Sequence, residues 1–429
     1  MTRFQLIFTG LLVACAVFGV VLFATNRNNN SGTAPQVVMW GTVSSSQMSA
    51  FLSEVSLQYR DKVNISYVQK QSASFESDLI ATLARGQGPD MVLLPQDLIS
   101  KQFDKFYVLP YENYSERIFK DSFIEGSELY ATPNGIVGIP FSVDPMVMYW
   151  NRDMFGDAGI SLPPVSWTEL YTLAPKLIQK DSNGNILRAM VAMGASTNIV
   201  HGKDMLALLA IQAGSNIVSR GTQGNLEATL NKGQGQVPGE QAINFYTEFS
   251  NPSKPAYTWN RSLGIDRDMF VAGKLAIYFG YASELSGIRS SNPNLNFDVA
   301  MVPQTTGKKA TFGNMTGIAF LRTSPNVSTA ISAAALLTGK DLQALWSSQT
   351  KLPPVRRDLL ATTPGDAYLA VFYKSALMAK AWLDPYREAT DGVFSRLVDN
   401  VTSGRYRASQ AVGTANSEID TFIRNNPQQ

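Results

Sequence analysis

The residue types in this chain exclude several kinds of chemistry. His201 is the only histidine, so a Ser-His-Asp triad would have to use it, and a metal site built from several histidines is impossible. Its neighbours Lys203 and Asp204 indicate instead a polar residue near the start of a helix. Cys15 is the only cysteine, which excludes disulfides, thiol catalysis and cysteine-ligated zinc in the chain beyond it.

Acidic residues and glycine patches do not add a catalytic motif. The 34 Asp and Glu residues offer many pairs for glycoside hydrolysis, but no motif selects one of them. Gly86-Gln87-Gly88 and Gly233-Gln234-Gly235 lack the spacing and the strand-to-helix setting of a nucleotide-binding loop, which favours turns. No cofactor is therefore implied, and ligand binding is favoured over catalysis.

A better signal for binding lies between Trp40 and Ser46. Trp40 could stack on the apolar face of a sugar ring, or it could be a core residue at the end of a strand. Ser44, Ser45 and Ser46 precede an amphipathic segment, where helix N–H groups and hydroxyls can receive ligand oxygens. As plain helix caps they would need no ligand, so both interpretations remain open.

A β-sheet would position Trp40 and the three serines, and the first part of the chain has the sequence pattern of such a sheet. Apolar strands at residues 37–40, 63–67 and 91–94 alternate with amphipathic helical segments, which predicts a βαβαβ unit. Such sheets bind ligands beyond the carboxyl ends of their strands. Here this places a cleft around Trp40 to Ser46 and Pro95 to Asp97.

The segment Gly138–Phe155 carries the most specific pattern. Pro140 and Pro145 exclude a helix and hold the chain extended, and the apolar residues that follow indicate a strand buried on both faces. A capping box at Ser166–Glu169 then predicts a helix from Trp167. The chain therefore runs as one extended segment from one structural unit into another.

These segments resemble the extracellular solute-binding proteins of the maltose-binding-protein type, the ligand receptors of ABC importers. The resemblance rests on Gly-Ile-Pro-Phe-Ser-Val-Asp at 138–144, Tyr-Trp-Asn-Arg-Asp-Met-Phe at 149–155 and Pro-Pro-x-Ser-Trp-x-Glu-Leu at 163–170. Residues 268–281 resemble the family's helix, Gly-Lys turn, strand and aromatic loop, and residues 354–356 its Pro-Val-Arg. Nearly the whole chain is covered.

The resemblance implies an α/β fold of the periplasmic-binding-protein type II, with two hinged lobes and open, mostly parallel sheets. Carried onto this chain, one lobe comprises residues 36–143 and 314–354, and the other residues 145–313 and 355–429. In the second lobe, the glycine-rich stretch at residues 219–239 suggests a mobile surface loop.

The family resemblance also implies which residues contact the ligand. Asp97 and Asp144 match family positions where acidic groups accept hydrogen bonds from ligand hydroxyls, although a solvated turn or a hinge cap would explain either. Tyr281 lies where the family often places a stacking aromatic residue.

Two tryptophans are further candidates for ligand contact. Trp259 and Trp382 could stack on a ligand, with a core or loop role as the alternative. Near Val393-Phe394 no tryptophan matches the late stacking residue of the sugar-binding prototype, which argues against a long oligosaccharide.

The N-terminus predicts export and attachment to a membrane. Leu6–Ala24 carries no charge and would span about 28 Å as a helix, enough to cross a bilayer core. Residues 1–25 are an uncleaved anchor, which we favour, a removed signal peptide, or a lipoprotein signal cut before Cys15. Residues 26–35 have the composition of a flexible tether.

Length and charge complete the hypothesis. A chain of 429 residues favours two domains, and 36 basic against 34 acidic residues give no electrostatic footprint for nucleic acid. We expect a membrane-tethered, extracytoplasmic, monomeric receptor that captures a small solute, with a saccharide favoured, and delivers it to an ABC permease. The alternatives are a sensory or adhesive ectodomain on the same fold, or a glycoside hydrolase.

Overall fold

The computed structural model describes residues 35–425 except residues 222–223 and 234. The expected anchor, Cys15 and all but the last residue of the expected tether lie outside this range. Among the described residues, no helix is long and apolar enough to cross a membrane.

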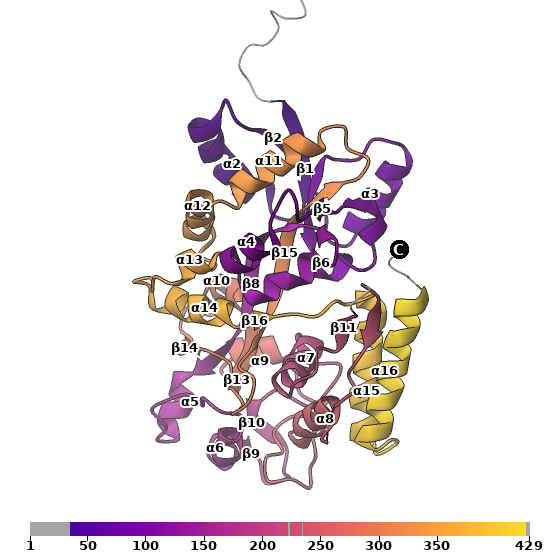
Figure 1. Cartoon of the computed structure of the whole chain (residues 1–429). Coiled ribbons are helices and arrows are strands. Elements are labelled where there is room, and N and C mark those ends of the chain that lie inside the picture. Colours follow the sequence, from indigo (N-terminus) through magenta and orange to yellow (C-terminus); the bar gives the residue numbers. More distant parts are fainter. Residues whose placement is uncertain (1–34, 222–223, 234, 426–429) are drawn as a thin grey trace, which may run out of the picture.

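Figure 1 shows two α/β halves, one above the other. The upper half carries four main helices: α2 (Ser45–Tyr59), α3 (Phe75–Ala84), α11 (Val327–Leu337) and α12 (Lys340–Thr350). The lower half carries α5 (Arg152–Asp157), α6 (Glu169–Leu177), α7 (Gly202–Gln212), α8 (Pro238–Glu248), α9 (Asp266–Val271), α15 (Arg387–Thr402) and α16 (Ala408–Asn425). Around the junction lie α4 (Glu116–Ser122), α10 (Leu285–Ser291), α13 (Arg357–Leu360) and α14 (Ala367–Leu377).

The strands of the upper half form the predicted βαβαβ unit. β1 (Gln36–Gly41) pairs in parallel with β2 (Asn64–Gln69) on one side and with β3 (Met91–Pro95) on the other. Apolar side chains of these strands face α2, whose Met48, Phe51 and Val55 are buried. The sequence pattern therefore predicted this unit correctly.

A single sheet continues from the upper half into the lower half, in the order β2-β1-β3-β15-β8-β13-β10-β9. The first part of β8 (Ile139–Asn151) pairs with β15 (Thr311–Leu321), and its second part pairs with β13 (Leu275–Tyr281). Both pairings of β8 are antiparallel, and so is that of β15 with β3. The expectation of mostly parallel sheets is therefore wrong in the middle, where the two long strands that link the halves make the sheet mixed.

The segment around β8 follows its sequence pattern closely. β8 is extended and almost wholly buried through Asn151, whose side-chain oxygen accepts a hydrogen bond from the Met154 N–H and starts α5. At the next helix, Glu169 accepts from the Ser166 N–H at 2.9 Å, as a capping box requires. α6 itself begins at Glu169 rather than at Trp167, because the two preceding residues form a turn.

The stretch at residues 219–239, expected to be a mobile surface loop, contains regular structure in its described residues. A hairpin of β11 (Val218–Arg220) and β12 (Leu226–Ala228) occupies its first part, and α8 begins at Pro238. The Ala228 N–H donates to Asp420 Oδ1 on α16. Packing against α16 gives this stretch an ordered partner that its composition did not indicate.

The remaining strands are short or lie at the edges. They are β4 (Phe106–Tyr107), β5 (Leu109–Pro110), β6 (Ala131–Thr132), β7 (Gly135–Ile136), β9 (Gln179–Lys180), β10 (Ile186–Val191), β14 (Phe297–Ala300) and β16 (Ala379–Lys380). Short 3₁₀-helices are η1 (Gln96–Leu98), η2 (Phe103–Lys105), η3 (Glu125–Tyr130) and η4 (Ala282–Glu284). β10 runs parallel to β13.

Candidate ligand-binding site

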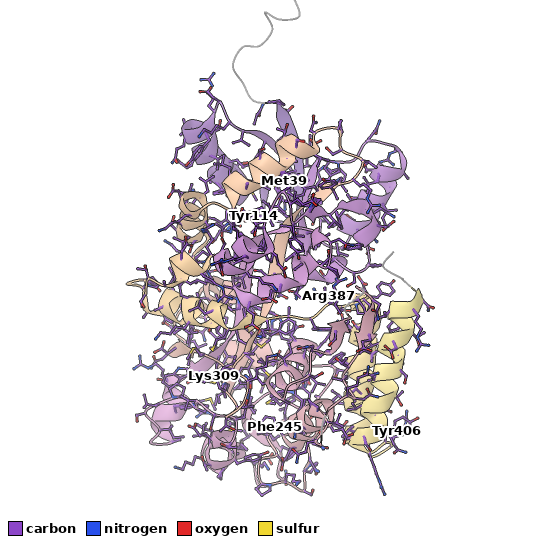
Figure 2. The ribbon with its side chains drawn as sticks, viewed as in Figure 1. Met39, Tyr114, Phe245, Lys309, Arg387 and Tyr406 are labelled. Carbon is purple, nitrogen blue, oxygen red and sulfur yellow. The ribbon has the colours of Figure 1, made fainter. Side chains whose placement is uncertain are left out.

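An ion pair joins the two halves at the carboxyl end of β3. Asp97, in η1 directly after β3, accepts from Arg387 Nη1 at 3.1 Å. Arg387 is the first residue of α15 in the lower half, and Figure 2 shows it at the junction, with Met39 in the upper half and Tyr406 at the far end of the lower half. Beside this pair, Lys101 Nζ lies 3.9 Å from the centre of the Tyr386 ring.

The start of α7 supplies polar groups on the lower side of the same junction. His201 precedes α7 as its N-cap residue, as the sequence predicted, and Asp204 lies in the first turn. Asp204 Oδ2 accepts from the hydroxyl of Tyr281 at 2.6 Å, and the ring of Tyr281 meets that of His201 edge to face at 4.8 Å. Burial lowers the pKa of Arg387, but the charge of Asp97 and its hydrogen bond outweigh burial and raise it. The charge of Asp204 adds to this increase, which shows that Asp204 lies near Arg387.

His201 is paired with a partly buried carboxylate. Its Nε2 lies 2.8 Å from Glu284 Oε1, and Glu284 also accepts from the Tyr281 N–H and the Tyr278 hydroxyl. Burial alone would lower the pKa of His201, but the hydrogen bond to Glu284 and its charge outweigh burial and raise it. The same contacts outweigh the effect of burial on Glu284 and lower its pKa. Both effects favour a charged pair.

Asp144 lies on β8 where the strand passes between the halves. Its Oδ1 accepts from the N–H of Ser283, two residues after Tyr281, at 3.0 Å. Burial raises the pKa of Asp144 from its ordinary 3.8 to about 6, and the charge of Glu284 adds to the increase. We call Asp97, Asp144, His201, Asp204, Tyr281, Glu284 and Arg387 the junction cluster.

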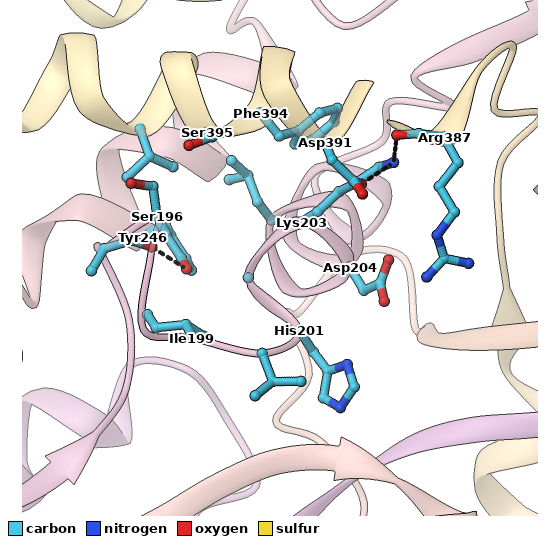
Figure 3. A pocket seen from close by; sticks show the side chains of 15 residues that line it. Ser196, Ile199, His201, Lys203, Asp204, Tyr246, Arg387, Asp391, Phe394 and Ser395 are labelled. Atoms are coloured by element: carbon cyan, nitrogen blue, oxygen red, sulfur yellow. Dashed lines mark hydrogen bonds and ion pairs between the residues drawn. The ribbon is translucent and has the colours of Figure 1, made fainter. Parts of the chain in front are cut away.

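A cavity of about 320 Å³ opens beside the junction cluster, between the start of α7 and α15. Figure 3 shows His201, Lys203 and Asp204 at the start of α7, with Arg387 and Asp391 facing them from α15. The apolar part of its lining is formed by Ala195, Ile199, Leu206, Phe394 and Val398. A cavity of this kind combines an apolar surface with convergent polar groups, as small-molecule sites do.

Most charged groups around this cavity are paired within the protein, and Asp204 is held by the hydrogen bond from Tyr281 instead of an ion pair. Lys203 Nζ lies 2.7 Å from both Asp384 Oδ2 and Asp391 Oδ1. Arg387 has Asp97, and His201 has Glu284. An occupant therefore meets hydrogen-bonding groups without a large excess of either charge, which suits a neutral polar molecule better than a strong ion.

The contacts of Trp40 and of the three serines are with Lys70, Gln47, Gln69 and one another, and not with residues of the junction cluster. Trp40 is buried at the end of β1, with Lys70 Nζ 3.8 Å from its ring centre. Ser44 caps α2 by accepting from the Gln47 N–H, and the N–H and hydroxyl of Ser45 both donate to Gln69. Ser44, Ser45 and Ser46 are exposed. Ser44 therefore acts as a helix cap, whereas Ser45 contacts Gln69 on β2 and Ser46 contacts the Ser44 hydroxyl.

The two later tryptophans are buried. Trp259 is fully buried in the lower half, where its Nε1–H donates to Asn198 Oδ1 at 3.0 Å. Trp382 is 3% exposed and packs against Phe394, with Lys203 Nζ 5.7 Å from its ring centre. Trp259 therefore has the core role that its sequence left open, while Trp382 supports Lys203 and Phe394, which line the cavity.

Sequence reasoning missed Arg387 and Asp204. Arg387 pairs with a residue 290 positions away, so no local pattern links the two. Asp204 was noted only as a neighbour of His201, although its place in the first turn of a predicted helix beside the sole histidine was a usable signal. No group of three His, Cys, Asp or Glu residues that could hold a metal ion occurs in the described part of the chain.

Comparison with known sequences points to one family. The family model of the bacterial extracellular solute-binding proteins matches residues 57–372, well over half of the chain. Among individual relatives, a binding protein of Brucella abortus is 23% identical over 330 residues, which cover 73% of this chain and 75% of that protein. A Brucella suis binding protein matches to the same extent.

Solved structures share the fold. A cyclo/maltodextrin-binding protein in complex with maltotetraose has a TM-score of 0.74 at 17% identity, covering 93% of this chain and 100% of its own. The sugar-binding protein MalE of Xanthomonas citri has a TM-score of 0.73 at 15% identity, covering 91% and 98%. An ABC transporter solute-binding protein of Thermotoga lettingae with alpha-D-tagatose has a TM-score of 0.64 at 19% identity, covering 91% and 100%.

These likenesses show the periplasmic-binding-protein fold, and the family match covers both halves of the sheet. Members of this family bind solutes for ABC importers outside the cytoplasm and are not enzymes. This chain belongs to the bacterial extracellular solute-binding protein family.

Proposed function

We propose that this chain captures a small saccharide between its two halves and delivers it to the permease of an ABC importer. The observation that carries the proposal is the junction cluster, where carboxylates, a guanidinium and a tyrosine from both halves meet. The cavity beside it has charges that are mostly paired within the protein. Sugar hydroxyls both donate and accept hydrogen bonds, so they match such a mixed, nearly neutral surface. The sugars bound by the similar structures support the same class of ligand.

The two halves would serve as lobes. We infer lobe boundaries at residues 36–143 with 314–354 and at residues 145–313 with 355–429. The passage of β8 and β15 between the halves supports the crossings near residues 144 and 313, and the crossing near residue 354 rests on the family resemblance. A solute that contacts both lobes favours the closed arrangement, since only that arrangement buries two of its faces. Asp97 and Arg387 would then act on opposite sides of the closing gap.

Attachment to the membrane is a further part of the proposal. The uncharged stretch Leu6–Ala24 would hold the receptor at the outer face of the membrane, near its permease, with lipidation of Cys15 as the alternative attachment. Mass spectrometry of the membrane-extracted protein separates the possibilities, because an intact N-terminal peptide indicates an anchor and a lipid adduct on Cys15 indicates a lipoprotein.

The decisive test is a ligand panel with the purified full-length protein. Monosaccharides, disaccharides, short peptides and polyamines are added in turn, and thermal unfolding is followed. A true ligand at 100 times its dissociation constant stabilises the protein by about 2.7 kcal/mol. Stabilisation by one or more saccharides and not by peptides or polyamines supports the proposal. Stabilisation by peptides or polyamines alone would contradict it.

A further inference from the structure

A second, larger cavity adjoins the junction cluster through η4, whose Ala282 and Ser283 line it while the Ser283 N–H donates to Asp144. It has a volume of about 660 Å³ and is enclosed by η4 and α10 on one side and by the end of α12 and the start of α14 on the other. Its apolar lining consists of Ala282, Leu285, Leu352, Tyr368, Leu369 and Phe372. The volume falls within the range of about 300–1,000 Å³ that is usual for small-molecule sites.

Two cations at this cavity have no carboxylate partner. Arg289 and Lys351 both line it and are exposed. Within residues 35–425 as described, neither forms an ion pair. The guanidinium of Arg289 lies 4.5 Å from the ring centre of Tyr368, which holds it against the apolar wall.

The one carboxylate of the lining is already used by the backbone. Asp366 Oδ1 accepts from the Leu369 N–H at 2.9 Å and caps α14. Lys351 is fixed beside the cavity by a left-handed backbone, with φ of 59° at the end of α12. The cavity therefore presents an apolar interior and positive charge at its rim, the reverse of the balanced cavity beside α7.

We propose that this second cavity is a binding site for a small amphipathic carboxylate, with its hydrocarbon part among the apolar side chains and its carboxylate at Arg289 and Lys351. Charge complementarity selects an anion over a cation. The apolar lining selects a hydrocarbon chain over a polyhydroxy compound, so this ligand differs in class from the proposed saccharide.

A series of eight-carbon probes tests the chemistry. Calorimetric titration of the full-length protein compares octanoate, octanol and octylamine, which share a chain and differ in charge. Octanoate should bind at least tenfold more tightly than octanol, because a charge-assisted hydrogen bond replaces a neutral one, and octylamine should not bind. Going from hexanoate to octanoate should tighten binding about tenfold, since two more methylene groups are buried.

Two substitutions locate the site. Arg289→Gln and Lys351→Asn should each weaken octanoate binding several-fold and leave octanol unchanged, and asparagine tolerates the left-handed backbone at residue 351. Arg405→Gln, the matched control, removes an exposed arginine between α15 and α16, neither of which lines the cavity, and should change nothing. Melting temperatures of all variants verify folding, and the exposed Lys351 provides a variant that leaves the core intact.

Arg387→Gln separates this site from the junction cluster. It should leave octanoate binding unchanged even if it abolishes saccharide binding. The inference is overturned if octanol or octylamine binds as tightly as octanoate, or if none of the three binds. It is also overturned if both cavity variants bind octanoate like the unmodified protein, or if Arg387→Gln alone removes that binding.

Discussion

At the scale of single residues, Arg387 connects the two halves of the proposed site. Its guanidinium pairs with Asp97 at 3.1 Å and faces the cavity beside α7. Arg387→Gln should weaken saccharide binding at least tenfold, because it removes charged donors and leaves Asp97 without its partner. Calorimetric titration with the sugar found in the panel measures the effect.

Arg396 provides the matched control on the same helix. It pairs with Glu418 on α16, away from the cavity, so Arg396→Gln should bind the sugar with unchanged affinity. Equal affinities for the Arg387 variant and the control would show that Arg387 is not part of the site.

Asp144 gives a prediction in the pH dependence of stability. Its pKa is raised by burial from 3.8 to about 6, so the folded protein holds a proton that the unfolded chain has lost between these values. Ionisation of Asp144 therefore costs stability as pH rises from about 4 to 6, and the cost persists above that range. Asp144→Asn keeps an oxygen for the Ser283 N–H and removes the cost.

We expect Asp144→Asn to increase the free energy of unfolding by about 1–2 kcal/mol at pH 8 and by much less at pH 4. The increase in the pKa of Asp144 from 3.8 to about 6 corresponds to about 3 kcal/mol of folding free energy. We expect a smaller effect because the Asp144 side chain is partly exposed and solvent screens its charge. Urea unfolding at the two pH values measures it. Asp61→Asn, at an exposed position, is the control, and an equal gain at both pH values would contradict the assignment.

At the scale of elements, Gln212 holds α7 in place. It is 2% exposed, accepts from Trp167 Nε1 at 2.6 Å, and donates to the carbonyls of Pro303 and Ala310. Gln212→Ala should reduce the free energy of unfolding by about 3 kcal/mol, because it leaves buried polar groups without partners. Urea unfolding measures the loss.

Gln241→Ala on α8 is the control, since Gln241 is exposed. Gln241→Ala should reduce the free energy of unfolding only slightly. A loss below about 1 kcal/mol for Gln212→Ala would mean that water replaces the lost contacts and that α7 does not depend on this side chain.

Local sequence patterns predicted many of the helices and strands. Alternating apolar strands and helices gave the three strands of the upper half, and the prolines of β8 gave its extended course. The antiparallel pairing of β8 and β15 and the contact of Asp97 with Arg387 could not be predicted this way. They depend on which distant segments meet, and a residue's own neighbours in sequence carry no signal for that. Trp259 illustrates the same limit, because the pattern around it did not distinguish a core indole from an exposed one.

At the scale of the whole molecule, saccharide binding should change the distance between the halves. Fluorophores at Ser49→Cys on α2 and Ser417→Cys on α16, both exposed positions, report this distance in a Cys15→Ser background. Energy transfer should change with saccharide at the concentration that saturates calorimetric binding.

A pair within the lower half, Lys176→Cys on α6 and Ser417→Cys, is the control and should not respond. Both positions belong to the half that is expected to move as one body. If neither pair responds while calorimetry reports binding, the saccharide binds without closure and the inferred lobes do not move.

The late position of β15 in the chain affects how the protein folds during synthesis. β3 is synthesised early, but the strand that covers its second edge, β15, follows all the central strands of the lower half. A nascent polypeptide that has not yet reached β15 carries a strand with an open row of hydrogen-bonding groups, which favours aggregation. Rapid translocation or a chaperone that shields that row would therefore be needed until translation passes Leu321.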